Sequence, residues 1–352
     1  MRMGGTPPGT ALGEWKRHWT LVVAAAFGCS STGLSLYSTS AFMEPVTDEF
    51  GWSRTAFSAG TTILNLGAAL SAVLIGTMID RRGPRLTGIC GLLFYCATIA
   101  LIGTTTGSTA NWLFLWFLAG IGAAWVQPTV WTSAVSSQFD ASRGLAIALT
   151  ISGSGIAAAI LPVLSTWLID TFGWRKAFAG IGVIWTLAVL PVLLLFFRGR
   201  YDPSKRPRPQ AVANTGADLP GLTMAEGLRS ATFYKMLIAA MLFVFAAIAI
   251  IVHMIPILHD RGLGRITAAA IAGIIGIASI LGRFVAGSLI DRYRADRIAR
   301  IAFMLPSLSA LLLLFSEDIT LLAVAAGLVG LSGLCRAACR SSPRKSIRFE
   351  MW

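Results

Sequence analysis

The sequence is dominated by long blocks of apolar residues that are separated by short polar connections. A helix needs about 20 residues to cross the hydrocarbon core of a bilayer, and the blocks reach roughly that length. They are continuous rather than alternating, which excludes the strands of a membrane barrel. The pattern therefore predicts an all-α polytopic membrane protein with about ten transmembrane helices. The blocks span residues 20–43, 55–79, 86–106, 111–134, 144–169, 175–197, 233–257, 266–290, 298–316 and 319–335.

The composition agrees with this pattern. Of the 352 residues, 55% are hydrophobic and 13% are charged, and the mean hydropathy is +0.71. Soluble domains carry about twice that charged fraction. The first apolar block is too long for the core of a signal peptide and lacks a clear cleavage site, so we expect it to remain as the first helix. The five cysteines show neither a disulfide framework nor metal-ligand spacing.

The order of apolar and polar segments divides the chain into two helical units. The connections are short except for the segment from Arg198 to Thr232, which is polar, basic and contains several prolines. We predict a six-helix bundle before this segment and a partial bundle of about four helices after it. The predicted units are an N-terminal tail at 1–19, the first bundle at 20–197, a central loop at 198–232, the second bundle at 233–335 and a basic tail at 336–352.

Lysine and arginine residues concentrate on one side of this predicted topology. The two tails, the central loop and the loops after the second, fourth and eighth helices hold most of the 29 basic residues. The positive-inside rule therefore places both termini in the cytoplasm and predicts a multi-pass protein of the cell membrane. Because topology accounts for the net charge of +13, we expect the lipid bilayer, and not nucleic acid, as the partner of these residues.

An internal repeat relates the two units at an offset of 211 residues. Gly76 and Asp80, at the end of the second predicted helix, correspond to Gly287 and Asp291 at the end of the eighth. The same offset matches Pro45 with Pro256, Gly51 with Gly262 and Arg54 with Arg265. Several landmarks at one offset indicate parallel repeats, an arrangement found in many secondary transporters.

The segment from Gly76 to Arg85 reads G-x-x-x-D-R-x-G and then a proline and an arginine. It is similar to the signature loop of the major facilitator superfamily, and the partial copy at 287–292 and the long central loop strengthen this resemblance. Within the superfamily, the chain resembles the branch of monocarboxylate and oxalate/formate porters through segments 50–54, 144–155 and 172–175. The resemblance implies a fold of two six-helix parallel repeats, of which the second is incomplete here.

The resemblance also implies a function for the signature loop. In the superfamily this loop bridges the two halves and helps to latch one conformation, with its carboxylate facing the positive end of a helix. Asp80 would supply that carboxylate, and Gly83 permits the tight turn. The alternative is a simple cytoplasmic anchor, which explains the arginines but not the aspartate or its copy. The predicted latch residues are Gly76, Asp80, Arg81, Gly83, Arg85, Asp291 and Arg292.

Arg283 is the most informative polar residue within a predicted span. It lies eight positions before Asp291, which is roughly 12 Å from the cytoplasmic end of the helix. Burying its charge in a membrane costs at least ~2.5 kcal/mol, so such a residue usually faces a cavity or a partner. In the monocarboxylate and oxalate porters an arginine of the eighth helix binds the substrate anion, and Arg283 resembles it in position. A snorkelling or helix-packing arginine is the alternative.

Three further polar residues are candidates for a substrate site. His253 could relay protons because imidazole titrates near neutral pH, although a hydrogen bond to a neighbouring helix is the plainer interpretation. Tyr37 and Gln127 lie at a suitable depth for a cavity, and their alternative role is helix–helix contact. Glu44 stands where many monocarboxylate porters have a lysine before the proline. This departure weakens the assignment of the substrate more than that of the transporter.

The second repeat ceases to resemble the first after Gly333. At the observed offset a complete second bundle would extend well past residue 352, and from residue 334 the sequence is basic without an apolar period. We expect either a natural ten-span variant or a reading-frame shift near residue 334, and the abrupt loss of repeat and hydropathy favours the shift. A chain of this length would then be inactive or poorly stable alone, because alternating access needs both halves.

The leading hypothesis is a secondary active transporter of a small organic anion, a monocarboxylate or dicarboxylate, with proton coupling left open. Arg283, Tyr37, Gln127 and His253 are the predicted substrate-binding residues. The alternatives are an efflux transporter for drugs or other small molecules, and a non-transporting membrane remnant or receptor. We find no nucleophile–base set, zinc motif or phosphate-binding glycine loop, so we expect neither an enzyme nor a cofactor. A monomer is expected.

Overall fold

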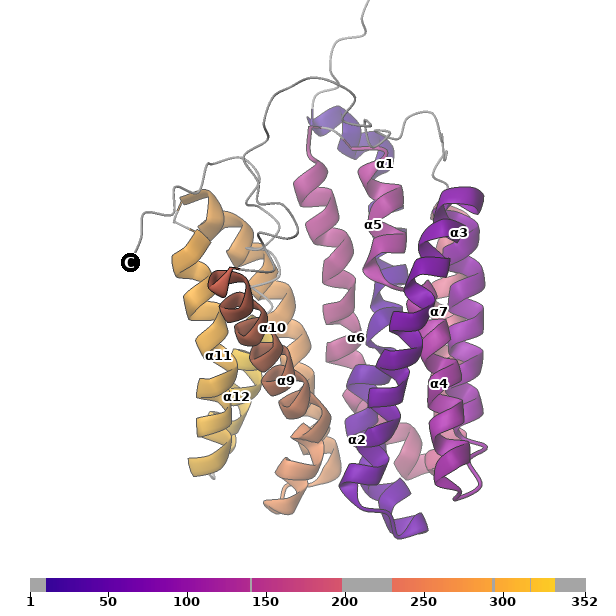
Figure 1. Cartoon of the computed structure of the whole chain (residues 1–352), viewed down its shortest axis with the longest axis vertical. Helices are drawn as coiled ribbons and strands as arrows, with labels where there is room; N and C mark the ends of the chain where they lie inside the picture. Colours follow the sequence, from indigo (N-terminus) through magenta and orange to yellow (C-terminus); the bar gives the residue numbers. More distant parts are fainter. Residues whose placement is uncertain (1–10, 140, 198–229, 293–294, 317, 333–352) are drawn as a thin grey trace, which may run out of the picture.

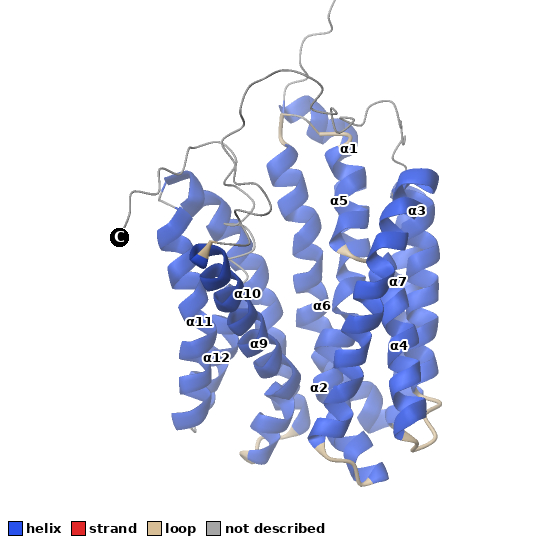
Figure 2. Cartoon of the chain, in the orientation of Figure 1, coloured by secondary structure: helices blue, strands red, loops and turns tan. Residues whose placement is uncertain are grey.

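The computed structural model describes residues 11–139, 141–197, 230–292, 295–316 and 318–332. In these residues every regular element is a helix (Figure 2), which confirms the predicted all-α class. Seven helical stretches in this part of the chain are long and apolar enough to cross a membrane. The number of spans, predicted as about ten, stays a prediction. The predicted central loop at 198–232 lies outside the described residues as far as residue 229, and the predicted tail at 336–352 lies wholly outside them.

The first bundle contains the helices up to α7 (Figure 1). Its elements are α1 (Ala11–Ser30), the 3₁₀ turn η1 (Ser31–Gly33), α2 (Leu34–Phe50), α3 (Arg54–Ile102), α4 (Thr109–Trp125), α5 (Pro128–Ser136), α6 (Arg143–Phe172) and α7 (Trp174–Phe196). The first predicted span is interrupted by η1, and the fourth is interrupted before Pro128, which lacks an amide hydrogen. The second predicted span and most of the third lie in α3, which is kinked at Gly83 and ends at Ile102.

The second bundle packs beside the first and contains four described helices, drawn in brown to yellow in Figure 1. They are α9 (Ala231–Asp260), α10 (Arg265–Arg292), α11 (Ala295–Phe315) and α12 (Ile319–Leu331). Helix α10 contacts α12, and α11 packs against both α9 and α12. All four overlap the predicted spans, which shows that hydropathy located these helices.

The repeat seen in the sequence is also visible in the backbone. Gly51 ends α2 with φ of 65°, and Gly262 follows α9 with φ of 82°. Both torsion angles lie in the left-handed region, where glycine has no Cβ to clash. The next helices then begin at Arg54 and Arg265, again 211 residues apart. Equivalent turns therefore redirect the chain at the same end of each unit, which we call the Gly51 end.

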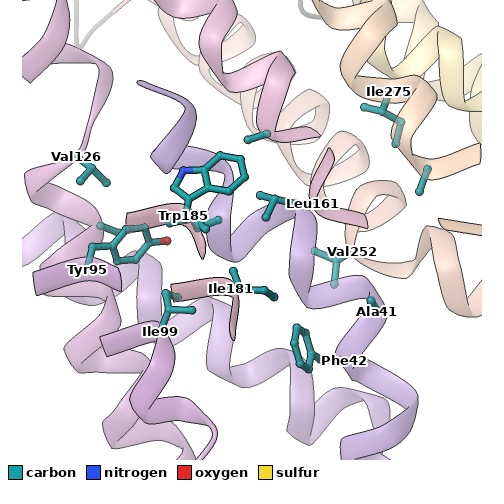
Figure 3. Close-up of a cluster of buried hydrophobic side chains, with 14 of the residues drawn as sticks. Ala41, Phe42, Tyr95, Ile99, Val126, Leu161, Ile181, Trp185, Val252 and Ile275 are labelled. Carbon is teal, nitrogen blue, oxygen red and sulfur yellow. The ribbon is translucent and has the colours of Figure 1, made fainter. Parts of the chain in front are cut away.

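The interface between the two bundles is close-packed and largely apolar. Figure 3 shows Leu161 and Ala41 of the first bundle near Val252 of the second, and all three side chains are buried. The closest approach joins α6 and α10. A Cβ atom added at Gly276 would lie 2.1 Å from the backbone nitrogen of Ala159. Small residues allow the two helix backbones to meet in this way, so the halves form one continuous core here.

Candidate functional site

A cavity of about 90 Å³ lies between the two bundles. Its wall combines one helix of the first bundle with three helices of the second. Most of the lining side chains are aliphatic or aromatic, and a few polar groups interrupt them. The polar lining residues are Tyr37 of α2, Ser279 and Arg283 of α10, and Ser332, which follows α12. Among the described residues that line it, Arg283 is the only charged one. An apolar cavity with few convergent polar groups is the usual form of a small-molecule site.

Helix α6 of the first bundle holds the Arg283 side chain by two hydrogen bonds. Nη1 donates to the carbonyl oxygen of Ile151 at 2.5 Å, and Nη2 donates to the hydroxyl of Ser154 at 2.8 Å. The Ser154 hydroxyl in turn donates to the Ile151 carbonyl at 3.2 Å. Arg283 is half-buried. The guanidinium therefore bridges the two halves beside the cavity. This contact is the kind expected of a helix-packing arginine, and the ligand role of Arg283 stays a prediction.

The structure brings two of the four predicted substrate-binding residues together. Tyr37 and Arg283 line the same cavity, although α2 and α10 belong to different bundles. Gln127 is exposed and precedes Pro128 at the break between α4 and α5, away from the cavity lining. His253 is half-buried on α9 and is also absent from the lining. A ligand role for Gln127 and His253 has no support from this cavity and stays a prediction.

The signature loop is a kink within a continuous helical segment. Gly83 has φ of 82° and ψ of 160°, as expected for the tight turn, and its carbonyl accepts a hydrogen bond from the Thr87 hydroxyl at 2.8 Å. Arg85 donates to the carbonyl of Leu194 at 3.2 Å and so ties the loop to α7. Gly76, Asp80 and Arg81 are exposed. Helix α10 runs through Asp291 to Arg292, whose side chains lie outside the described part.

A group of contacts between the halves at the Gly51 end was not predicted. Arg54 pairs with Asp260 through two hydrogen bonds of 2.9 and 3.1 Å. Glu44 lies 3.3 Å from Nδ1 of His259, and Asp170 lies 3.6 Å from Nε of Arg265. We call these three pairs the inter-half clasp. Glu44, noted in the sequence only as a departure from the porters, thus contacts the opposite half.

The sequence carried a partial signal for the clasp. The repeat marked Arg54 and Arg265 as equivalent residues, but their partners lie far away in the chain. A second cluster at the same end stays within the first bundle. Glu49 accepts hydrogen bonds from Arg175 at 2.7 Å and from the Trp174 indole at 2.5 Å. Ion pairs between the halves and ion pairs within one bundle can be distinguished only when the fold is known.

The fold and the sequence define the family. The chain belongs to the Major Facilitator Superfamily, whose family model matches residues 23–343. Members of this superfamily are membrane transporters and not enzymes. The match continues past Gly333, where the internal repeat becomes unrecognisable. The predicted reading-frame shift near residue 334 concerns residues outside the described part of the chain and stays a prediction.

Individual relatives are similar over much of the chain. Monocarboxylate transporter 11 of Homo sapiens is 29% identical over 295 residues, which cover 81% of this chain and 58% of that protein. The gallate transporter of Pseudomonas putida is 26% identical over 321 residues, covering 84% of this chain and 70% of that protein. The chain spans about half to two thirds of the length of several such relatives.

The fold is similar to that of solved transporters. The D-xylose–proton symporter superposes with a TM-score of 0.62 at 14% sequence identity, covering 90% of this chain and 80% of that one. At this low identity the likeness concerns the fold alone. It agrees with the predicted arrangement of two parallel helical repeats.

Proposed function

We propose that this protein is a secondary active transporter that carries a small organic anion by alternating access between its two halves. The observation that supports this most directly is the position of Arg283 in the cavity between the bundles. Small residues at the contact of α6 with α10 permit close packing. Such a contact lacks bulky interdigitated side chains that would hinder a relative movement of the two helices.

The chemistry of the cavity favours an anion. A guanidinium can hold a carboxylate through two parallel hydrogen bonds, which fixes both position and orientation of the ligand. The apolar wall around Arg283 suits the carbon skeleton of an organic acid, and the Tyr37 and Ser279 hydroxyls can bind further oxygen atoms. The printed names of two relatives, a monocarboxylate transporter and a gallate transporter, agree with this class of substrate.

The contacts at the Gly51 end support the alternating-access part of the proposal. The inter-half clasp fastens the first and second bundles together at that end. With both termini in the cytoplasm, as the distribution of basic residues predicts, the clasp would face the outside. The state described here would then be closed to the outside, and the signature loop with Asp80 would lie at the cytoplasmic end. We propose that this loop latches the alternative state.

Uptake into proteoliposomes tests the proposal. The proposal requires the unmodified chain to accumulate radiolabelled benzoate or lactate, an outcome that would contradict the inactivity expected from a reading-frame shift. Arg283→Gln should abolish uptake while leaving membrane insertion and helix content unchanged. Arg283→Lys keeps the charge but lacks the planar fork, so we expect most of the uptake to be lost. Equal uptake by the wild type and by Arg283→Gln would contradict the site, and uptake of neutral but not anionic compounds would contradict the substrate class.

Efflux of drugs is the second candidate. A chloramphenicol resistance protein of Acinetobacter baumannii is 30% identical over 143 residues, although these cover only 40% of this chain. The basic group in the cavity disfavours cationic drugs. Measuring chloramphenicol efflux in cells that express the chain separates this function from organic anion uptake.

A further inference from the structure

The partners of Arg283 belong to the opposite half of the molecule. Ile151 and Ser154 are on α6, whereas Arg283 is on α10, and the three residues form a connected set of hydrogen bonds. A guanidinium has five N–H donors in one plane. The α6 acceptors engage one donor on each terminal nitrogen and so fix the orientation of that plane. Both of these acceptors are neutral groups.

We infer that Ser154, together with the Ile151 carbonyl, positions the Arg283 guanidinium for the anion. This inference rests on the proposed function, because it assigns a positioning residue to the same site. Ser154 is well suited for this role because its hydroxyl both accepts from Arg283 and donates to Ile151. An alanine at this position would remove the acceptor that Ser154 gives to Nη2, so that α6 would hold the guanidinium through the Ile151 carbonyl alone.

The location of the contact has a consequence for transport. The orientation of Arg283 depends on α6 and α10 remaining together at the depth of the cavity. When the halves move apart there, the hydrogen bonds to Ile151 and Ser154 break and the guanidinium loses its fixed plane. The affinity for the anion is thereby linked to the relative position of the two halves. Binding is tight when the helices meet and weak when they separate, as a carrier requires for release.

Equilibrium binding separates the role of Ser154 from that of Arg283. The full chain is placed in lipid nanodiscs, and the affinities for benzoate and for the neutral analogue benzamide are measured by titration calorimetry. Ser154→Ala should weaken benzoate binding about tenfold, equivalent to ~1.4 kcal/mol, because a hydrogen bond to a charged group is lost. Benzamide binding should change little. Ser154→Thr retains the hydroxyl and should restore the affinity for benzoate.

A matched control lies on the same helix. The Ser152 hydroxyl donates to the Ala148 carbonyl at 2.9 Å and makes no described contact with Arg283. Ser152→Ala should therefore leave the affinity for benzoate within about twofold of the wild type. If Ser152→Ala and Ser154→Ala weaken binding equally, or if Ser154→Ala weakens benzoate and benzamide alike, the positioning role is wrong.

The two proposals can fail separately. If Ser154→Ala binds benzoate with wild-type affinity and Arg283→Gln does not bind it, the positioning role of Ser154 is wrong and the anion site at Arg283 is supported. Wild-type affinity in Arg283→Gln would overturn both. Both would also fall if the unmodified chain binds none of benzoate, lactate and gallate.

Discussion

The Arg54 guanidinium and the Asp260 carboxylate form a two-bond ion pair that joins the two halves at the Gly51 end, with distances of 2.9 and 3.1 Å. Arg265 occupies the position of Arg54 in the second repeat and lies 3.6 Å from Asp170 of the first half. In each repeat, the arginine that begins α3 or α10 thus contacts an aspartate of the opposite half. The two arginines are equivalent in the repeat, but their partners are not, because Asp260 corresponds to Glu49 at the offset of 211 and Asp170 lies on another helix, α6.

Removing the charge of Asp260 should loosen the Gly51 end. Both side chains of the pair are about half exposed, at 49% and 52%, so solvent screening limits its contribution to about 0.2–1 kcal/mol. Asp260→Asn should therefore shift the equilibrium toward a state open at this end by no more than about fivefold. Electron–electron double resonance between spin labels on the α2–α3 and α9–α10 turns measures the populations of the two states.

The Glu49–Arg175 pair provides the control for that experiment. It lies at the same end and has a similar exposure, but both residues belong to the first bundle. Glu49→Gln should leave the distances between the halves unchanged, and the exchanged pair Arg54→Asp with Asp260→Arg should restore the wild-type distribution. An equal shift in Glu49→Gln and Asp260→Asn would show that the clasp does not hold the halves together.

The helices could be predicted because hydropathy is a property of contiguous residues. Every predicted span overlaps a helix of the described chain, since a membrane helix needs a continuous apolar run. The breaks at Ser31–Gly33 and before Pro128 were not predicted. Such breaks leave backbone groups that neighbouring helices or polar side chains must satisfy, and no local pattern shows whether these partners are present.

The candidate site was only partly predictable for the same reason. Arg283 could be recognised alone because a charge within an apolar run is costly wherever its partners lie. Its contacts with Ile151 and Ser154 depend on how the two bundles meet, and these residues are about 130 positions away. Gln127 and His253 were predicted as substrate-binding residues from their position along the membrane-spanning segments. That position does not determine which face of a helix points to the cavity. Only the packing of the halves decides this.

Gly83 should be required by its backbone conformation. Its φ of 82° and ψ of 160° lie in a region where other residues are strained by about 1–3 kcal/mol. Gly83→Ala should therefore lower the free energy of unfolding by that amount in a denaturation experiment with sodium dodecyl sulfate. Gly76→Ala is the control in the same loop, because a Cβ added there meets nothing within 4 Å. Equal destabilisation by both substitutions would contradict a special role of the turn.

Asp318 should stabilise α12 in a pH-dependent manner. Its carboxylate accepts hydrogen bonds from the backbone N–H and the hydroxyl of Thr320, both at 2.8 Å. These hydrogen bonds, chiefly the one from the backbone, hold the pKa of Asp318 below its ordinary value. The stabilisation is therefore present above the unfolded pKa and is lost as the pH falls through the folded pKa.

Thermal unfolding of the purified chain between pH 7 and pH 3 tests this effect. Asp318→Ala should lower Tm at pH 7. The difference in Tm between this variant and the wild type should decrease progressively as the pH falls below about 4. Asp318→Asn keeps an acceptor for the Thr320 N–H, so its Tm at pH 7 should fall less than that of Asp318→Ala. A difference in Tm that stays constant over the whole range would exclude a charged cap.

Gly276 should control both stability and anion affinity through the contact of α6 with α10. A Cβ atom at this position would lie 2.1 Å from the Ala159 nitrogen and 2.4 Å from the Gly155 carbonyl oxygen. Gly276→Ala must push the helices apart, and overpacking of this kind costs about 1–3 kcal/mol. Arg283 lies two helical turns away, so its hydrogen bonds to α6 should weaken as well. The affinity for benzoate should then fall along with Tm, whereas Gly327→Ala, which has open space around its Cβ, should change neither. Loss of stability in Gly276→Ala with unchanged affinity would show that the anion site does not depend on this contact.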